Sequence, residues 1–526
     1  MPRWDDGYVT DVTYTTNFYR ELTPIWLTTA CLLLGQRAPD LTRPFRYADL
    51  GCGHGFTTLV VAATHPEAEV WGFDFNPAHV EWSTRLAESA GLSNAHFVET
   101  SFADLAARAE SNLPQFDFMV SHGVASWISP ENRKWMLDVI RQRLRAGGLA
   151  YVSYNVSTGW AAMVPVRQLM CMLSDASSAR TDQAGVAALD FIARMRQSGA
   201  LFFQANARLE SRLEELRRQD PRYIAHEYLN RDWHPLMFAD MAEEMYEARC
   251  TFVGSATLNE NIDSLSAPDG MLPLLSEAGD RVLRETLRDF AASQAFRRDI
   301  YRRGPAPIAA SEQAGLLDEL AIAPMGQVVP DEINFATSLG TVTGRPEVYR
   351  PLFETLVTGV RSLREIRESP PFAGRPLGEL LQAITLMIAG GYAHPVVPGG
   401  APTEARNATR RLNEMIAVEN ARGVELQRLA VPLIGSALQV DLLETLMLGD
   451  LLSGLPATLP NLTLAVTSGL ERSGRKMQRD GKPVTDPAET RTMAAEIAER
   501  FLHRRIPLLQ MLGVLEPSPA PEQRRG

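Results

Sequence analysis

Cysteine is scarce in this chain, and so are long apolar runs. The 526 residues include four cysteines and no C-x-x-C pair, a pattern that favours neither a disulfide framework nor a zinc site. The longest apolar run, Ile25–Leu34, is shorter than the roughly 20 residues that span a bilayer. Acidic residues stand near the N-terminus where a signal peptide has a basic leader. We therefore expect a cytoplasmic protein without membrane insertion or a metal site.

Positive charge is also in short supply. The chain has 52 Lys+Arg against 63 Asp+Glu, a net charge of -11 at pH 7. Because an acidic surface repels phosphate backbones and anionic lipids, nucleic acid is not an expected partner.

The 45% hydrophobic and 22% charged content is typical of a folded globular protein. The length suffices for about three to four domains.

From Arg46 onward, short apolar runs alternate with amphipathic stretches, which is typical of a doubly wound α/β sheet. The predicted strands are Phe45–Leu50, Glu69–Phe73, His96–Glu99, Phe116–Ser121 and Gly148–Tyr154. A helix over Pro235–Ala248 and strands over Cys250–Leu258 and Arg298–Tyr301 are expected to complete this α/β core.

Changes of pattern divide the chain into six parts. In order, we expect an N-terminal arm and helix (1–40, with the helix over Pro24–Leu34), a Rossmann-like core (41–160), a helical insertion (161–222), the remainder of the α/β core (223–304), a mainly helical domain (305–514) and a disordered tail (515–526).

The most informative segment follows the first predicted strand and reads Asp49-Leu50-Gly51-Cys52-Gly53-His54-Gly55. Alternating glycines let the backbone turn tightly and approach a ligand, and the helix expected over Thr57–Thr64 offers free N–H groups to an anion. A dinucleotide fingerprint would need glycine where the chain has Phe56. The segment instead resembles motif I of the class I S-adenosylmethionine-dependent methyltransferases. That resemblance implies that Gly51, Gly53 and Gly55 cradle the cofactor and that Asp49 holds its methionine ammonium.

The ends of the next strands supply further candidates for the cofactor site. Asp74, nineteen residues beyond Gly55, can accept two ribose hydroxyl protons, and Phe75 follows it. Ser101 stands where many members of the family have an adenine-binding aspartate, and Phe102 is suited to cover the adenine face.

Two aromatic residues complete the expected cofactor site, namely Tyr19 and His122. His122 has two readings, a general base or a structural histidine. Ser101 and Phe102 likewise have a structural alternative, an ordinary loop serine and a core phenylalanine.

Three further features indicate a narrower group within the methyltransferases. They are the segment from Tyr151 to Arg167, the aromatic residues Tyr14, Phe18 and Tyr19, and the run His226-Glu227-Tyr228-Leu229. With the long C-terminal extension, they resemble bacterial methyltransferases that carry a methyltransferase regulatory domain, a group that includes the rickettsial protein-lysine methyltransferases. The resemblance implies S-adenosylmethionine as cofactor and a protein lysine as acceptor.

An acceptor lysine needs an apolar wall that favours its neutral amine. Candidates for the wall are Tyr14, Tyr19, Trp127, Tyr154 and Trp160. Asn155 is a candidate hydrogen-bond acceptor for the amine. Core aromatics and a strand-end asparagine are the alternative readings.

Three functions remain open at this point. The first is a protein-lysine methyltransferase. The second is a small-molecule O- or N-methyltransferase whose extra domains form a lid or a homodimer interface. The third is a noncatalytic protein that keeps the cofactor fold as a scaffold, although the glycine motif argues against it.

Overall fold

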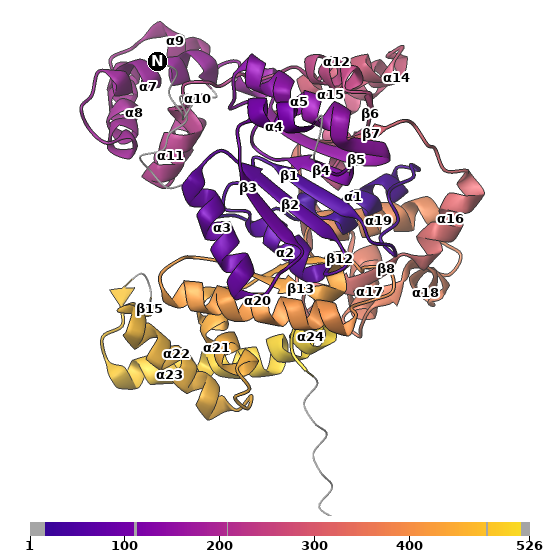
Figure 1. Ribbon diagram of the computed structural model, residues 1–526, viewed down its shortest axis with the longest axis vertical. Coiled ribbons are helices and arrows are strands. Elements are labelled where there is room, and N and C mark those ends of the chain that lie inside the picture. Colours follow the sequence, from indigo (N-terminus) through magenta and orange to yellow (C-terminus); the bar gives the residue numbers. More distant parts are fainter. Residues whose placement is uncertain (1–15, 110–112, 208, 480–481, 517–526) are drawn as a thin grey trace, which may run out of the picture.

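A seven-stranded sheet lies at the centre of the computed structural model, which describes residues 16–109, 113–207, 209–479 and 482–516. The strand order is β3-β2-β1-β4-β5-β7-β6 (Figure 1). The first five strands are parallel, and β7 runs antiparallel to both β5 and β6. The strands are β1 (Arg46–Leu50), β2 (Glu69–Asp74), β3 (Ala95–Glu99), β4 (Phe116–Ser121), β5 (Leu144–Asn155), β6 (Cys250–Ser255) and β7 (Phe296–Arg303). The predicted doubly wound sheet is confirmed.

Two hydrophobic cores cover the two faces of the sheet because side chains alternate along each strand. On β1, Tyr47 enters one core, whereas Ala48 and Leu50 enter the other. The first core includes residues of α1 (Pro24–Leu33), α2 (Phe56–Thr64) and α3 (Pro77–Ser89). The second includes residues of α4 (Phe102–Ala109), α5 (Pro130–Arg143) and α12 (Phe238–Glu247).

The expected helix from Pro235 begins later than predicted, at Phe238. The reason is a long-range contact, because Leu236 donates its N–H to the carbonyl of Asn155 at 2.9 Å and bridges to Val156. The strand predicted from Gly148 also begins earlier, at Leu144, through an irregular pairing with Phe116. Both differences arise from sheet pairing that local sequence does not show.

The inserted helices form a lobe beside the sheet (Figure 1). They have their own hydrophobic core, which includes Ile224 and Tyr228. The helical lobe therefore extends to Tyr228, past the expected boundary at Arg222, because α11 packs against α8. The helices are α6 (Ser157–Trp160), α7 (Met163–Asp175), α8 (Thr181–Gln197), α9 (Leu201–Ala205), α10 (Leu209–Leu216) and α11 (Pro221–Tyr228).

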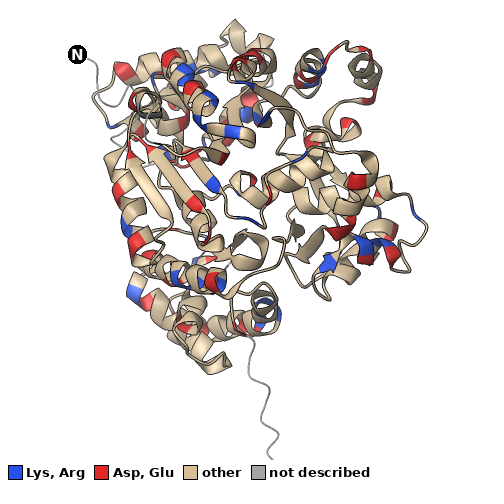
Figure 2. Cartoon of the chain, turned by 45° about the vertical axis from the view of Figure 1, so that its right-hand side comes forward, with Lys and Arg blue, Asp and Glu red and all other residues tan. Residues whose placement is uncertain are grey.

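The segment that returns to the sheet is also partly helical. α13 (Asp263–Ser266), α14 (Leu272–Glu277) and α15 (Arg281–Ala292) lie between β6 and β7. No helix among the described residues is both long and apolar enough to cross a bilayer. Charged residues of both signs are interspersed along the outer helices (Figure 2).

Residues 305–514, expected as one helical domain, are divided between two hydrophobic cores. The part up to α20 shares the core of α1 and α2, and the last helices form a core of their own. The helices are α16 (Ala310–Glu319), α17 (Pro346–Leu356), α18 (Leu363–Glu368), α19 (Leu377–Ala389), α20 (Thr403–Ala421), α21 (Leu442–Leu452), α22 (Leu459–Ser473), α23 (Pro487–Arg500) and α24 (Ile506–Met511).

Short strands accompany these helices. They pair as β8 (Ala321–Pro324) with β11 (Arg361–Ser362) and β12 (Ala393–Pro395), β9 (Asn334–Thr337) with β10 (Gly340–Thr343), β13 (Arg428–Val431) with β14 (Ser436–Gln439), and β15 (Gln478–Arg479) with β16 (Lys482–Pro483). Of the tail expected over 515–526, residues 517–526 lie outside the described residues.

A buried ion network fastens β7 to α15. Arg297 donates to both oxygens of Asp299 at 3.0 Å, to Asp289 at 2.6 Å and to Glu285 at 3.0 Å. Tyr154 of β5 donates its hydroxyl to Asp299 at 2.6 Å. Burial raises the pKa of Asp289 to about 7 and that of Asp299 to about 6, while Arg297 opposes the rise. The network therefore depends on the single arginine.

We expect Arg297→Met to lower the free energy of unfolding by about 3–5 kcal/mol, because it leaves buried carboxylates without their cation. The matched control is Arg345→Met, which removes an exposed pair with Glu379 and is expected to cost at most about 1 kcal/mol. Urea unfolding of both variants measures the difference. Equal losses in the two variants would contradict the network's role.

The same variant has a predicted pH dependence. Without Arg297, the folded-state pKa values of Asp289 and Asp299 rise further above the unfolded value of about 4. The folded variant then binds more protons than the unfolded chain, so its stability falls as pH increases from about 4 past 7. The deficit relative to the wild type should be larger at pH 8 than at pH 5.

Candidate functional site

A cavity of about 580 Å³ lies at the carboxyl ends of the parallel strands. Loops that follow β1, β2, β3 and β4 line it, together with Asn155 at the end of β5. The strand order reverses between β1 and β4, the place where open α/β sheets form their ligand crevice. The cavity thus coincides with the expected cofactor site.

The glycine loop forms one side of the cavity. Gly51, Gly53 and Gly55 have φ angles of 78°, 55° and 59°, in the left-handed region that favours glycine. A Cβ on Gly51 would lie 2.7 Å from Val124, and one on Gly55 would collide with the ring of Phe97. A Cβ on Gly53 would meet no atom within 4 Å. Gly53 is therefore the point at which the backbone leaves room for a ligand.

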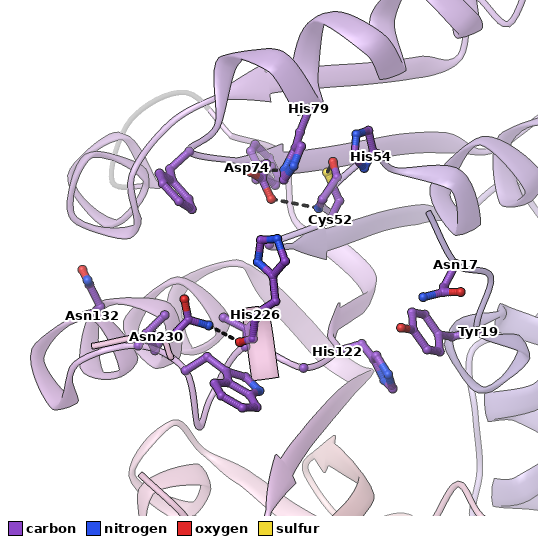
Figure 3. A pocket seen from close by; sticks show the side chains of 18 of the residues that line it. Asn17, Tyr19, Cys52, His54, Asp74, His79, His122, Asn132, His226 and Asn230 are labelled. Atoms are coloured by element: carbon purple, nitrogen blue, oxygen red, sulfur yellow. Dashed lines mark hydrogen bonds and ion pairs between the residues drawn. The ribbon is translucent and has the colours of Figure 1, made fainter. Parts of the chain in front are cut away.

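Asp74 lies beside this loop at the end of β2. Its Oδ2 accepts the Gly53 N–H at 2.8 Å, and its Oδ1 accepts the Asn76 N–H at 2.9 Å. His79 of α3 contacts Oδ1 at 3.3 Å through Nδ1 and packs against His54 with ring centroids 4.4 Å apart (Figure 3). The carboxylate is thus held in place from three sides and lines the cavity.

Asp49 is not among the cavity-lining residues. Its side chain accepts a hydrogen bond from Thr58 of α2 at 2.8 Å, and only 4% of the residue is exposed. Burial raises its pKa to about 7. The Asp49 carboxylate therefore turns toward Thr58 in the first turn of α2, and its contact with a ligand ammonium stays a prediction.

The adenine-side candidates reach the cavity, although one has a structural task as well. Phe75, Ser101 and Phe102 all line it. Ser101 donates its hydroxyl to Asp104 at 2.8 Å and accepts the Asp104 N–H at 3.1 Å, so it also caps α4. Ser101 therefore caps α4 and also lines the cavity.

His122 and Tyr19 form a corner of the cavity. Their ring centroids lie 3.8 Å apart, and the Tyr19 N–H donates to Thr57 at the start of α2 at 3.1 Å. Nδ1 of His122 lies 2.8 Å from the hydroxyl of Tyr151 and 3.2 Å from that of Ser153. Burial, followed by the charge of Arg298, lowers the pKa of His122 to about 3. The imidazole is therefore neutral at pH 7 in this site.

Of the acceptor-side candidates, Tyr19, Trp127, Asn155 and Trp160 line the cavity. Tyr14 lies outside the described residues. Tyr154 does not line the cavity, because its fully buried side chain points to Asp299 behind the sheet. The expected aromatic wall is corrected accordingly.

Several residues that line the cavity were not among the site residues predicted from the sequence. They are Thr16, Asn17, Cys52, His54, His79, Val124, Asn132, Tyr223, His226, Glu227, Asn230, Phe296 and Arg298, among others. Figure 3 shows His226 and Asn230 across the cavity from Asp74. The run from His226 indicates only a family resemblance, and the sequence of β7 contains no recognisable motif.

Comparisons with known proteins decide the family. The chain is 36% identical over 511 residues to the uncharacterized protein sll1526 of Synechocystis sp., covering 97% of this chain and 99% of that protein. Residues 48–148 match the family model of a methyltransferase domain, and residues 220–303 match a predicted methyltransferase regulatory domain. The chain belongs to the S-adenosylmethionine-dependent methyltransferases.

This methyltransferase also resembles a solved structure over nearly its whole length. The structure is that of PKMT2 from Rickettsia typhi in complex with AdoHcy, with a TM-score of 0.70, 19% identity and coverage of 95% of this chain and 99% of that chain. A shorter match links the methyltransferase to trans-aconitate 2-methyltransferase of Streptomyces avermitilis, at 36% identity over 93 residues, 18% of this chain and 33% of that protein.

The regulatory segment is built into the methyltransferase fold. Residues 220–303 contain α11, β6 and β7, so the segment contributes two strands to the central sheet. It also supplies Tyr223, Glu227 and Arg298 to the cavity lining. The segment is therefore part of the site itself.

We expect Gly53→Val to weaken binding of S-adenosylhomocysteine at least about tenfold, because the new side chain would occupy the open space beside the loop. The control is Gly399→Val, which has a positive φ and no atom within 4 Å of its Cβ but lies outside the cavity. Calorimetry measures binding, and thermal unfolding verifies the fold. Normal affinity in a folded Gly53→Val would contradict the loop's role.

Proposed function

We propose that this methyltransferase transfers the methyl group of S-adenosylmethionine to lysine side chains of a protein substrate. The observation that carries the proposal is one cavity with two chemically different walls. The strand-end wall holds a glycine loop and a fixed carboxylate, and the other wall, from the loop after β4, α6 and the regulatory segment, holds aromatic rings and Glu227.

The strand-end wall fits the methyl donor. Gly53 leaves space for a ligand beside its backbone, and Asp74 presents a fixed carboxylate to two ribose hydroxyls. Phe75 and Phe102 provide apolar surface for the adenine. When bound, the cofactor supplies an activated methyl group on a sulfonium, so the protein needs no covalent nucleophile of its own.

The other wall fits an amine on a long aliphatic stem. Trp127, Trp160 and Tyr223 offer aromatic surface for the stem. Glu227 is half-buried and attracts the protonated amine to the cavity. Burial among the rings then disfavours the charge, which lowers the pKa of the amine and favours the neutral, nucleophilic form.

Asn155 orients the acceptor in this proposal. The residue is 4% exposed, and its amide Nδ2 has no hydrogen-bond partner among the described residues. The backbone N–H of Asn155 is held by Ser126 at 2.9 Å and its carbonyl by Leu236, so the residue is anchored on both sides. The side-chain carbonyl accepts one N–H of the amine and aligns its lone pair with the methyl group.

The structural likeness to PKMT2 supports a protein acceptor, because it extends over the insertion and the C-terminal helices and not only over the cofactor fold. A small carboxylic acid is the second candidate acceptor. It is favoured by Arg298, a cation in the cavity wall, and by the shorter match to trans-aconitate 2-methyltransferase.

We expect Asp74→Ala to weaken S-adenosylhomocysteine binding about 10- to 100-fold, because a charge-assisted hydrogen bond contributes about 1.5–3 kcal/mol. Asp40→Ala, an exposed carboxylate outside the cavity, is the control. Calorimetry on both variants measures the change. Unaltered affinity in a folded Asp74→Ala would show that the ribose is held elsewhere.

Transfer of a labelled methyl group to a cell lysate tests the acceptor. We expect label in the protein fraction, recovered as methylated lysine after hydrolysis, and little label with Gly53→Val. Label found only in solvent-extractable acids would overturn the lysine proposal and favour the second candidate.

A further inference from the structure

Arg298 of β7 presents a guanidinium to the cavity without a carboxylate partner. Among the described residues, its side chain makes one hydrogen bond, from Nη1 to the Thr257 hydroxyl at 3.3 Å. Its Nε is buried and has no partner. Glu21 of the preceding N-terminal segment pairs with Arg20 at 3.6 Å. No carboxylate among the described residues therefore forms an ion pair with Arg298.

The position of Arg298 follows from sheet pairing. It lies opposite Ser153 of β5, and the Ser153 hydroxyl accepts the N–H of Gly123 at 2.8 Å. The guanidinium lies 5.0 Å from the centre of the Phe296 ring, and that ring lies 5.8 Å from the ring of His122. Arg298 thus stands at the corner where β4 and β5 end, beside the expected methyl-transfer region.

An unpaired cation in this position is costly to the folded protein. Partial removal from water penalises a charge unless an anion compensates it. The field of Arg298 also reaches its neighbours, because it contributes to the lowered pKa of His122 after burial. A bound anion would offset this cost, and the planar fork of arginine matches the two oxygens of a carboxylate.

We propose that Arg298 binds a ligand carboxylate in the cavity. This inference rests on the proposed function, which supplies two sources of such a group. One is the carboxylate at the methionine end of the methyl donor, and the other is an acidic group on the acceptor. Either source makes Arg298 a binding residue that the regulatory segment contributes to the methyltransferase.

Two ligands separate the sources, S-adenosylhomocysteine and 5′-methylthioadenosine, which lacks the amino-acid end. Calorimetry is done on the full chain with Arg298→Met, which keeps the apolar stem, and with Arg298→Lys. If the donor carboxylate is bound, Arg298→Met loses about 10- to 100-fold in S-adenosylhomocysteine affinity, keeps its 5′-methylthioadenosine affinity, and Arg298→Lys recovers part of the loss.

If the acceptor carboxylate is bound, both ligands keep their affinities. The KM for the acceptor identified in the labelling experiment then rises at least about tenfold in Arg298→Met, with the KM for the donor unchanged. The matched control is Arg303→Gln, on the same strand but outside the cavity, which should change none of these values. Thermal unfolding verifies that each variant is folded.

The inference is overturned if a folded Arg298→Met binds S-adenosylhomocysteine normally and keeps its KM for the acceptor. It is also overturned if both ligands lose affinity equally, because the effect is then not specific to a carboxylate. A wild-type protein that does not bind S-adenosylhomocysteine would instead overturn the proposed function.

Discussion

The pairing of β7 with β5 is the constraint on which the site depends. It runs in register from Leu149 opposite Arg302 to Asn155 opposite Phe296. Because the two strands are antiparallel, the start of β7 meets the end of β5 at the edge of the sheet where the ligand crevice opens. The pairing also satisfies backbone groups that β5 would otherwise expose at an edge. The methyltransferase sheet and the regulatory segment are thus one structure.

The C-terminal region contacts the helix that follows the glycine loop, although it lies outside the cavity. The described lining of the cavity extends from Thr16 to Arg298, so the C-terminal region lines none of it. Instead, α20 packs against α2, the helix that begins at the glycine loop, and both share one hydrophobic core. Through α20, the C-terminal region therefore packs against the helix that begins at the glycine loop.

The strand-end part of the site was accessible from the sequence because a regular pattern creates it. Strand, turn and helix repeat, and the carboxyl ends of parallel strands meet at one edge, so Gly53, Asp74 and His122 converge. Asp49 does not line the described cavity, because its carboxylate accepts a hydrogen bond from Thr58, a contact that the sequence pattern does not show. Glu227 lies in a run that indicated only a family resemblance, and Arg298 lies in no motif, so the sequence assigned neither to the site; each reaches the cavity through the packing of a distant element.

The sequence by itself determined the class of fold and the cofactor, since hydrophobic periodicity sets the strands and only glycine tolerates the backbone of the loop. The tertiary structure alone decided which side chains face the cofactor across the cavity. That choice depends on the antiparallel pairing of β7 and on the docking of α11, contacts between residues far apart in the chain. Such contacts form only when apolar surfaces are buried together, and local sequence does not record them.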